Sequence, residues 1–269
     1  MTQAVGLTAK EALALLVPVV RKAGKIGLRY ARDGAKTFTK KDASPVTEAD
    51  LAINSFLAEQ LRDLSPAIAW LSEEDGDNPE RLKKRQVFIL DPIDGTRGFI
   101  AGNGEWVVSV GLIEDGRPIA GVLYRPTTDD LYKAGRGLGA HKNGDRLRVT
   151  GGDASSTAMI AGPKPAVDLL LGDLPNLKRI PSLASLALRL AFVAEGKCDA
   201  AFAKANAHDW DIAAADIILT EAGGRLTTLD GAEIAYNRPD PVHPTLVASG
   251  VARHDGLTAL LRQRLPHGS

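Results

Sequence analysis

The N-terminal part of the chain alternates apolar and polar positions at helical spacing. Between Thr8 and about Ala31 the apolar residues fall on one helix face: Leu13, Leu16, Val17, Val20 and Ile26. Thr8 and Glu11 form a capping-box pattern at the start of this stretch, and Pro18 predicts a bend or an early turn. A short strand is expected around 36–41, followed by a second helix over 46–64.

Apolar runs of strand length follow these helices. Residues 67–71 and 87–90 are short apolar runs that end in acidic residues. Further strands, joined by tight turns such as Asp115-Gly116 and Asn143-Gly144, are expected over 106–113, 118–125 and 131–133. This part of the chain therefore predicts an antiparallel sheet.

The pattern changes after about Ser155, where strands and helices alternate. The expected elements cover 158–161, 166–171, 183–194, 200–203 and 212–222. Such alternation predicts an α/β layer. We therefore expect a layered α/β (α+β) protein, with an α+β subdomain over 1–152 that contains the antiparallel sheet and an α/β subdomain over 153–269.

Composition and charge narrow the possible functions. The chain of 269 residues has 33 basic and 33 acidic side chains, and this balance argues against a nucleic-acid partner but not against a small phosphorylated substrate. The one cysteine, Cys198, cannot form an internal disulfide, and its place before an expected strand argues against catalysis. Neither a convincing signal peptide nor a membrane-spanning run is evident, so we expect a soluble, cytoplasmic protein with no membrane contact.

The segment Asp91-Pro92-Ile93-Asp94-Gly95-Thr96 carries the strongest chemical signal. It follows the apolar run 87–90, so two carboxylates emerge where a strand ends. Hard divalent cations bind such oxygen ligands, and backbone N–H groups after a glycine turn suit a phosphate. The pattern favours metal-assisted chemistry on a phosphate, with a plain Asp-Gly turn as the alternative. Haloacid-dehalogenase-type phosphatases have their two aspartates two positions apart, whereas the spacing here is three. The segment therefore lacks the acid that those enzymes need, which argues against that class.

Three more acids lie at the ends of expected elements. Asp50 follows Pro45-Val46-Thr47, Glu73 follows the run 67–71, and Asp211 precedes an alanine-rich helix. Each alone has an ordinary explanation: Asp211 could cap its helix and Asp50 could lie on a solvated helix face. Their occurrence together with the 91–96 segment indicates a metal site.

These motifs together resemble the inositol monophosphatase family of magnesium-dependent, lithium-sensitive phosphatases. D-P-I-D-G-T at 91–96 and W-D-x-A-A followed by E-A-G-G over 210–224 occur in order at the expected separation. The resemblance implies the α-β-α-β-α sandwich of that family, two to three Mg²⁺ ions and a small phosphorylated substrate. The metal ligands that it implies are Glu73, Asp91, the Ile93 carbonyl, Asp94 and Asp211.

The resemblance also implies roles around the reacting phosphate. Asp50 and Thr96 match the pair that orients and deprotonates the attacking water. The backbone N–H groups of Gly95 and Thr96 match the phosphate contact. In-line attack by water is expected, without a phospho-enzyme.

Several segments resemble the 3′(2′),5′-bisphosphate nucleotidase branch more than the inositol monophosphatases or the histidinol-phosphate phosphatases. These segments are 42–50, 71–75, 95–105 and 193–196. Residues 201–207 lack the acid that inositol enzymes usually carry before the W-D pair and contain Lys204, a cation that suits a second phosphate.

We therefore expect hydrolysis of 3′-phosphoadenosine 5′-phosphate, with inositol 1-phosphate or another sugar or polyol phosphate as the alternative. Ser185, Lys204 and His208 are candidate substrate contacts in addition to Gly95 and Thr96. A non-catalytic, protein-binding regulator is a third hypothesis. The sequence allows a monomer or a homodimer.

Overall fold

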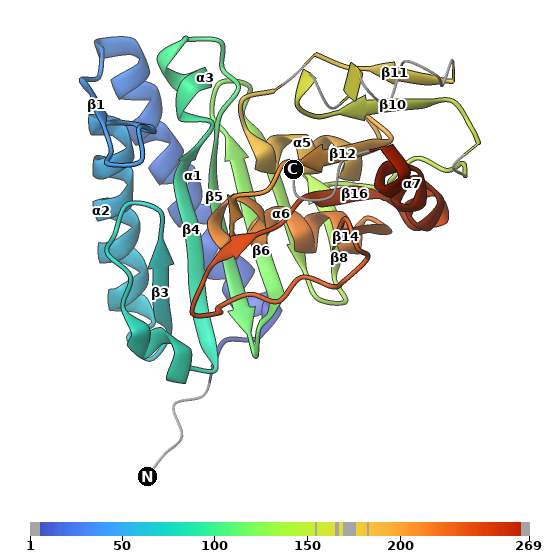
Figure 1. The fold of residues 1–269 in the computed structure, drawn as a ribbon. Coiled ribbons are helices and arrows are strands. Elements are labelled where there is room, and N and C mark those ends of the chain that lie inside the picture. The colour runs from blue at the N-terminus through green and yellow to red at the C-terminus, as the bar shows by residue number, and fades with distance from the viewer. Residues whose placement is uncertain (1–5, 154, 165–166, 169–175, 182, 265–269) are drawn as a thin grey trace.

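Two β-sheets and the helices around them form five layers (Figure 1). The computed structural model describes residues 6–153, 155–164, 167–168, 176–181 and 183–264. Helices α1 (Ala9–Asp33) and α2 (Glu48–Leu64) cover one face of a seven-stranded sheet, and α5 (Leu186–Ala194) and α6 (Asp209–Glu221) cover the other face. Beyond them lies a five-stranded sheet, with α7 (Val251–Arg264) on its far side. The α-β-α-β-α order is the expected one, so the predicted fold class is confirmed.

The larger sheet has the strand order β3-β4-β5-β6-β7-β8-β9. β3 runs parallel to β4, and the other neighbours pair antiparallel. Its strands are β3 (Ala69–Ser72), β4 (Gln86–Asp94), β5 (Val107–Glu114), β6 (Arg117–Arg125), β7 (Asp130–Gly135), β8 (Gly139–Lys142) and β9 (Asp145–Arg146). The 3-10 helix η1 (Pro79–Lys83) connects β3 to β4.

The smaller sheet has the order β11-β10-β12-β16-β14 and mixes parallel with antiparallel pairs. Its strands are β10 (Ala158–Ala161), β11 (Leu177–Arg179), β12 (Ala200–Ala203), β14 (Gly224–Thr228) and β16 (Leu246–Gly250). Two short pairs complete the described strands: β1 (Thr37–Thr39) with β2 (Pro45–Thr47), and β13 (Ala207–His208) with β15 (Val242–His243).

Some expected boundaries need correction. The helix expected over 46–64 begins at Glu48, because residues 45–47 pair with β1. The strand expected to end at Leu90 continues to Asp94. Pro18 lies inside α1, which continues to Asp33, so it does not mark an early turn. The helix expected over 166–171 lies almost entirely outside the described residues.

Helix α6 is buried between the two sheets because small residues let it approach the larger one closely. A Cβ atom at Gly121 in β6 would lie 2.5 Å from the Ala214 carbonyl oxygen, and one at Gly111 in β5 would lie 3.1 Å from the Ala214 nitrogen. The helix is apolar on most sides, with Ile212 and Ile218 both fully buried, as expected for an element covered on both faces. This packing fixes where the helix starts, and Asp211 lies at that start.

The two halves of the chain share one hydrophobic core. The larger sheet ends with β9 and the smaller begins with β10, on either side of the expected boundary between residues 152 and 153. Core residues from both sheets nevertheless join through α5 and α6. None of the described helices is long and apolar enough to cross a membrane.

Candidate active site

A bulge at the end of β4 brings two of the expected carboxylates to the same face of the sheet. Residues of a strand alternate between faces, so positions 91 and 94 would ordinarily point to opposite sides. Here Asp91 lies opposite Ser109 whereas Asp94 lies opposite Val107, and the register shifts between them. The extra residue in β4 turns Asp94 to the side of Asp91.

Asp211 completes a cluster of three carboxylates. It is the third residue of α6, and its Oδ2 accepts a hydrogen bond from the His208 backbone N–H at 2.7 Å. Carboxylate oxygens of Asp91, Asp94 and Asp211 all lie within 4.8 Å of one another. The structure thus brings together three of the five expected metal ligands.

The start of α5 holds Asp94 in place. The Ser185 hydroxyl donates a short hydrogen bond to Asp94 Oδ2, and the Ala187 N–H donates to the same oxygen at 2.7 Å. Ser185 is fully buried at this position. Although Ser185 was expected to contact the substrate, the structure places its hydroxyl against a carboxylate of the cluster.

The cluster is electrostatically unfavourable without a cation. Burial raises the pKa of Asp91 and Asp211 well above the usual value, and the neighbouring carboxylates raise it further. Burial also raises the pKa of Asp94 to about 6, even though the hydrogen bond from Ser185 opposes this. A divalent cation would offset the mutual repulsion, and carboxylate oxygens are the ligands that hard cations prefer. The residues present therefore fit a site for a hard divalent cation.

Glu73 lies at the edge of this cluster and has a cationic partner of its own. Lys40, from the connection between β1 and β2, places its Nζ 2.7 Å from Glu73 Oε1 and 2.6 Å from Glu74 Oε1. The carbonyl of Ile93 accepts a hydrogen bond from the Thr96 hydroxyl at 3.1 Å. Among the described residues, neither Glu73 nor this carbonyl belongs to the three-carboxylate group, so their role as ligands stays a prediction.

Asp50 and Thr96 approach each other beside the cluster. Asp50 is the third residue of α2, and its Oδ2 accepts hydrogen bonds from the backbone N–H and the hydroxyl of Thr47 at 2.8 and 2.6 Å. Its other oxygen, Oδ1, lies 3.3 Å from Thr96 Oγ1. Burial raises the pKa of Asp50. The pair that the sequence indicated is therefore within contact distance.

Gly95 gives the chain a turn that other residues would not readily adopt. Its φ is 98°, in the left-handed region, and a Cβ atom there would lie 2.5 Å from the Glu105 carbonyl oxygen. Thr96 then begins the short helix α3 (Thr96–Ile100). Both residues line the cavity beside the carboxylates.

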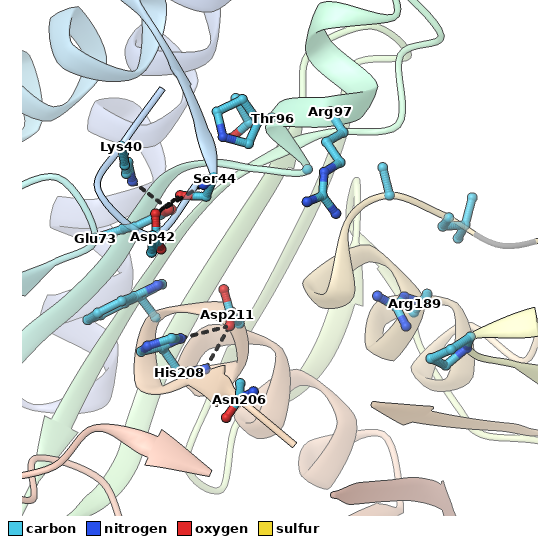
Figure 2. A pocket seen from close by; sticks show the side chains of 16 residues that line it. Lys40, Asp42, Ser44, Glu73, Thr96, Arg97, Arg189, Asn206, His208 and Asp211 are labelled. Carbon is cyan, nitrogen blue, oxygen red and sulfur yellow. Dashed lines mark hydrogen bonds and ion pairs between the residues drawn. The ribbon is translucent and has the colours of Figure 1, made fainter. Parts of the chain in front are cut away.

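Asp211 of the cluster and Glu73 line a cavity of about 750 Å³, within the usual size range of small-molecule sites. Figure 2 shows Glu73 and Lys40 on one side of this cavity, Asp211 and His208 below it, and Arg97 and Arg189 on the opposite side. The His208 ring stacks on Trp210, with ring centroids 4.5 Å apart and planes 9° apart. His208 thus lies at the cavity as expected, whereas Lys204 is exposed and is not among the lining residues.

The sequence interpretation missed the cations of this cavity. Arg97 directly follows the 91–96 segment, and Arg189 lies one helical turn after Ser185, so both stood next to residues already singled out. No described residue forms a hydrogen bond or an ion pair with the Arg97 guanidinium. Arg189 donates to the carbonyls of Ser185 and Phe202 at 3.3 and 3.5 Å. Among the described residues no carboxylate forms an ion pair with it, although the charges of Asp94 and Asp211 are close enough to favour its cationic form.

Comparison with known proteins identifies the family of the chain. The model of the "Inositol monophosphatase family" matches residues 8–265, which is nearly the whole chain. The chain belongs to the inositol monophosphatase family. Members of this family are metal-dependent phosphatases, so the protein is a phosphatase. The predictions that it is an enzyme and that it acts on a small phosphorylated substrate are confirmed by this membership.

Individual relatives of the chain are named as phosphatases of different substrates. A 3′(2′),5′-bisphosphate nucleotidase CysQ from Aggregatibacter actinomycetemcomitans is 30% identical over 86% of this chain and 90% of its own. A histidinol-phosphatase from Mycobacterium tuberculosis is 36% identical over 76% of this chain and 82% of its own. The solved structure of an inositol monophosphatase from Thermotoga maritima, 26% identical, superposes with a TM-score of 0.82 over 94% of this chain and 97% of that one. These relatives leave the substrate open.

Proposed function

We propose that this phosphatase is a magnesium-dependent, lithium-sensitive 3′(2′),5′-bisphosphate nucleotidase that converts 3′-phosphoadenosine 5′-phosphate to AMP. The observation that carries the substrate assignment is the pair of guanidinium groups, Arg97 and Arg189, that line the same cavity as Asp211 and Glu73. A bisphosphate needs one site for the reacting phosphate and a second anion site for the other. A guanidinium without a carboxylate partner suits a phosphate oxygen.

Asp91, Asp94 and Asp211 would hold the Mg²⁺ ions, with Glu73 and the Ile93 carbonyl as further oxygen donors. The ions, when bound, would supply positive charge next to the phosphate oxygens and make a water molecule easier to deprotonate.

The protein's own groups would complete the reaction around the phosphorus. Asp50 Oδ1 and Thr96 Oγ1 lie 3.3 Å apart, so the hydroxyl can accept a proton from the attacking water while it donates its own proton to the carboxylate. The raised pKa of Asp50, caused by burial, makes it a better acceptor for that proton. The backbone N–H groups of Gly95 and Thr96 would orient the reacting phosphate. As water attacks the phosphorus, the bond between the phosphorus and the nucleoside oxygen breaks, and that oxygen takes a proton from solvent to become the hydroxyl of AMP.

A substrate panel tests the assignment. With Mg²⁺ present, kcat/KM should be highest for 3′-phosphoadenosine 5′-phosphate and lower for inositol 1-phosphate and histidinol phosphate. A preference for either monophosphate would reject the nucleotidase and leave the sugar-phosphate or histidinol-phosphate alternative.

Reversing one cation at a time tests the second-phosphate contact. Arg97→Glu should lower kcat/KM for the bisphosphate by about 5- to 150-fold, mainly through KM, since a charge-assisted contact is worth about 1–3 kcal/mol. Inositol 1-phosphate, which lacks a second phosphate, should be affected little. Lys204→Glu is the matched control, because Lys204 is also exposed but lies outside the cavity lining. Equal losses of kcat/KM for both substrates in Arg97→Glu would contradict a contact between Arg97 and the second phosphate. A larger loss for the bisphosphate in Lys204→Glu would instead indicate that Lys204 binds the second phosphate.

A further inference from the structure

The first residue of α6, Asp209, is a fully buried carboxylate held by a separate segment of the chain. Its Oδ1 lies 2.7 Å from His243 Nε2, and its Oδ2 accepts a hydrogen bond from the Asn237 backbone N–H at 2.9 Å. The exposed fractions of the two side chains are 0% for Asp209 and 3% for His243. Asp209 also donates through its own N–H to the Pro241 carbonyl at 2.9 Å. The segment 237–243 therefore encloses the start of the helix.

Strand pairing ties the same segment to the residues just before α6. β13 and β15 pair antiparallel, with Ala207 opposite His243 and His208 opposite Val242. The Asn206 N–H donates to the His243 carbonyl at 3.0 Å. His243 thus contacts the chain on both sides of the helix start. Its backbone carbonyl binds Asn206 before the helix, and its imidazole binds Asp209, the first residue of the helix.

A buried arginine connects this segment to the other half of the protein. Arg81 in η1 donates through Nη1 to the Asn237 side chain at 2.8 Å and through Nη2 to the Arg238 carbonyl at 3.0 Å. Its guanidinium is paired with Asp77 and is 1% exposed. η1 lies in the connection between β3 and β4, and β4 carries Asp91 and Asp94. The network therefore spans from that connection to the helix that carries Asp211.

Asp211 is two residues after Asp209, in the same first turn of α6. Its position relative to Asp91 and Asp94 depends on where that turn is held. A buried carboxylate is tolerated only when its oxygens receive hydrogen bonds, so loss of the His243 imidazole would favour a displacement of Asp209 towards other donors or water. Any such displacement moves the backbone of the first turn and Asp211 with it.

We infer that His243 is a positioning residue for Asp211, acting through Asp209, and that it sets the affinity of the carboxylate cluster for a divalent cation. The inference rests on the proposed metal-binding role of Asp211. Groups that orient metal ligands typically change metal affinity by about 10- to 100-fold when they are removed.

Direct measurement of Mg²⁺ binding by calorimetry, with no substrate present, tests this role. His243→Ala should weaken Mg²⁺ binding by about 10-fold or more. His243→Gln should restore part of the affinity, because its side-chain amide can donate to Asp209 Oδ1. In turnover, His243→Ala should need more Mg²⁺ for half-maximal activity while KM for the phosphate substrate at saturating Mg²⁺ stays nearly unchanged.

His254→Ala is the matched control. His254 is also a buried histidine, 1% exposed, and contacts Thr227 and Ser249 on the smaller sheet. Its removal should lower the melting temperature and leave Mg²⁺ affinity unchanged. A similar loss of affinity in both variants would mean that general destabilisation, not positioning, is the cause, and would overturn the inference.

Two further variants separate the inference from the function that it rests on. If Asp211→Asn weakens Mg²⁺ binding and a folded His243→Ala does not, the inference is overturned and the metal-binding role of Asp211 stands. If Asp211→Asn leaves Mg²⁺ binding unchanged, the ligand assignment itself is wrong. Should His243→Ala not fold, Asp209→Ala removes the same contact from the other partner, and wild-type Mg²⁺ affinity in that variant would refute the positioning role.

Discussion

Replacing Asp91 by Asn should stabilise the metal-free protein while it removes most of the activity. Asp91 is buried among other carboxylates, and its Oδ1 accepts a hydrogen bond from the Ile93 N–H at 2.9 Å. The amide oxygen of an Asn side chain can accept the same bond. The variant therefore loses a buried negative charge and little packing.

Asp94, in the same cluster, gives the scale of the effect. Its pKa is raised from 3.8 to about 6, mainly by burial. A difference of one unit between the pKa values in the folded and unfolded states corresponds to about 1.4 kcal/mol. Keeping this carboxylate ionised at neutral pH therefore lowers the free energy of unfolding by about 3 kcal/mol. Burial and neighbouring carboxylates raise the pKa of Asp91 as well. We therefore expect Asp91→Asn to stabilise the metal-free protein at neutral pH and to raise its Tm, with the cost worked out for Asp94 as the order of magnitude.

The pH dependence follows from the direction of these shifts. The folded, metal-free protein keeps protons on the carboxylate cluster up to higher pH than the unfolded chain does. The contribution of the cluster to the free energy of unfolding therefore declines as pH rises from about 4 through 6. Asp91→Asn removes one of the titrating groups. The variant should consequently show a smaller loss of stability over that range.

Thermal unfolding in EDTA and in Mg²⁺ checks the prediction. Wild-type protein should gain stability when Mg²⁺ is added, because the ion binds the folded state, whereas the variant should gain little. Its kcat should fall by on the order of 10³-fold, as for loss of a strong electrostatic stabiliser. Asp216→Asn is the control, since burial also raises the pKa of Asp216 to about 6 but that residue lies outside the carboxylate cluster. A lower Tm of Asp91→Asn in EDTA, an intact response to Mg²⁺, or more than about a tenth of wild-type kcat would refute the reasoning.

Two further predictions concern metal identity and a buried histidine. Millimolar lithium should inhibit turnover in a phosphate-release assay. Calcium should not replace magnesium, because calcium takes more ligands at longer distances. Full activity with calcium in that assay would contradict the proposed metal centre. Burial, and secondarily Arg225, lowers the pKa of His254 from 6.5 to about 4, so the unfolded chain binds a proton there that the folded protein does not. The contribution of His254 to the free energy of unfolding should therefore fall by about 2–3 kcal/mol as pH drops from 6.5 to 4. Denaturant unfolding at several pH values should show the stability of wild-type protein falling relative to that of His254→Gln by this amount; a difference between the two proteins that does not change with pH would be inconsistent with it.

The sequence predicted the parts of the structure that depend on neighbouring residues. The capping box of Thr8 and Glu11 begins α1 as expected, and the Asp115-Gly116 and Asn143-Gly144 turns connect antiparallel strands. Both turns have residues at positive φ, for which Asn, Asp and Gly are suited. The antiparallel sheet and the α/β layer also followed from the order of apolar runs, whereas the α-β-α-β-α order of the whole chain followed from its resemblance to the inositol monophosphatase family.

Other features of the site depend on contacts that spacing alone does not specify. The bulge between Asp91 and Asp94 is a property of the pairing with β5, and the two carboxylates would diverge without it. Lys204 was favoured as the second-phosphate contact because it precedes the W-D pair, yet the cavity is lined instead by Arg97 from α3 and Arg189 from α5. Which cations share a cavity depends on how these helices pack, and no periodicity of the sequence states it.

The placement of Asp211 combines both kinds of information. Its chemical identity and its position near a helix start could be read from Trp210-Asp211 and the alanines that follow. Its meeting with Asp91 and Asp94 requires that α6 lie close against β5 and β6, which Gly111 and Gly121 permit. It also requires that the first turn be held at one point along the sheet, and the bonds from 237–243 to Asp209 provide that hold. Close packing restricts how far the helix lies from the sheet, and the buried polar contacts restrict where along the sheet it begins, so the geometry of the carboxylate cluster depends on residues that never touch it.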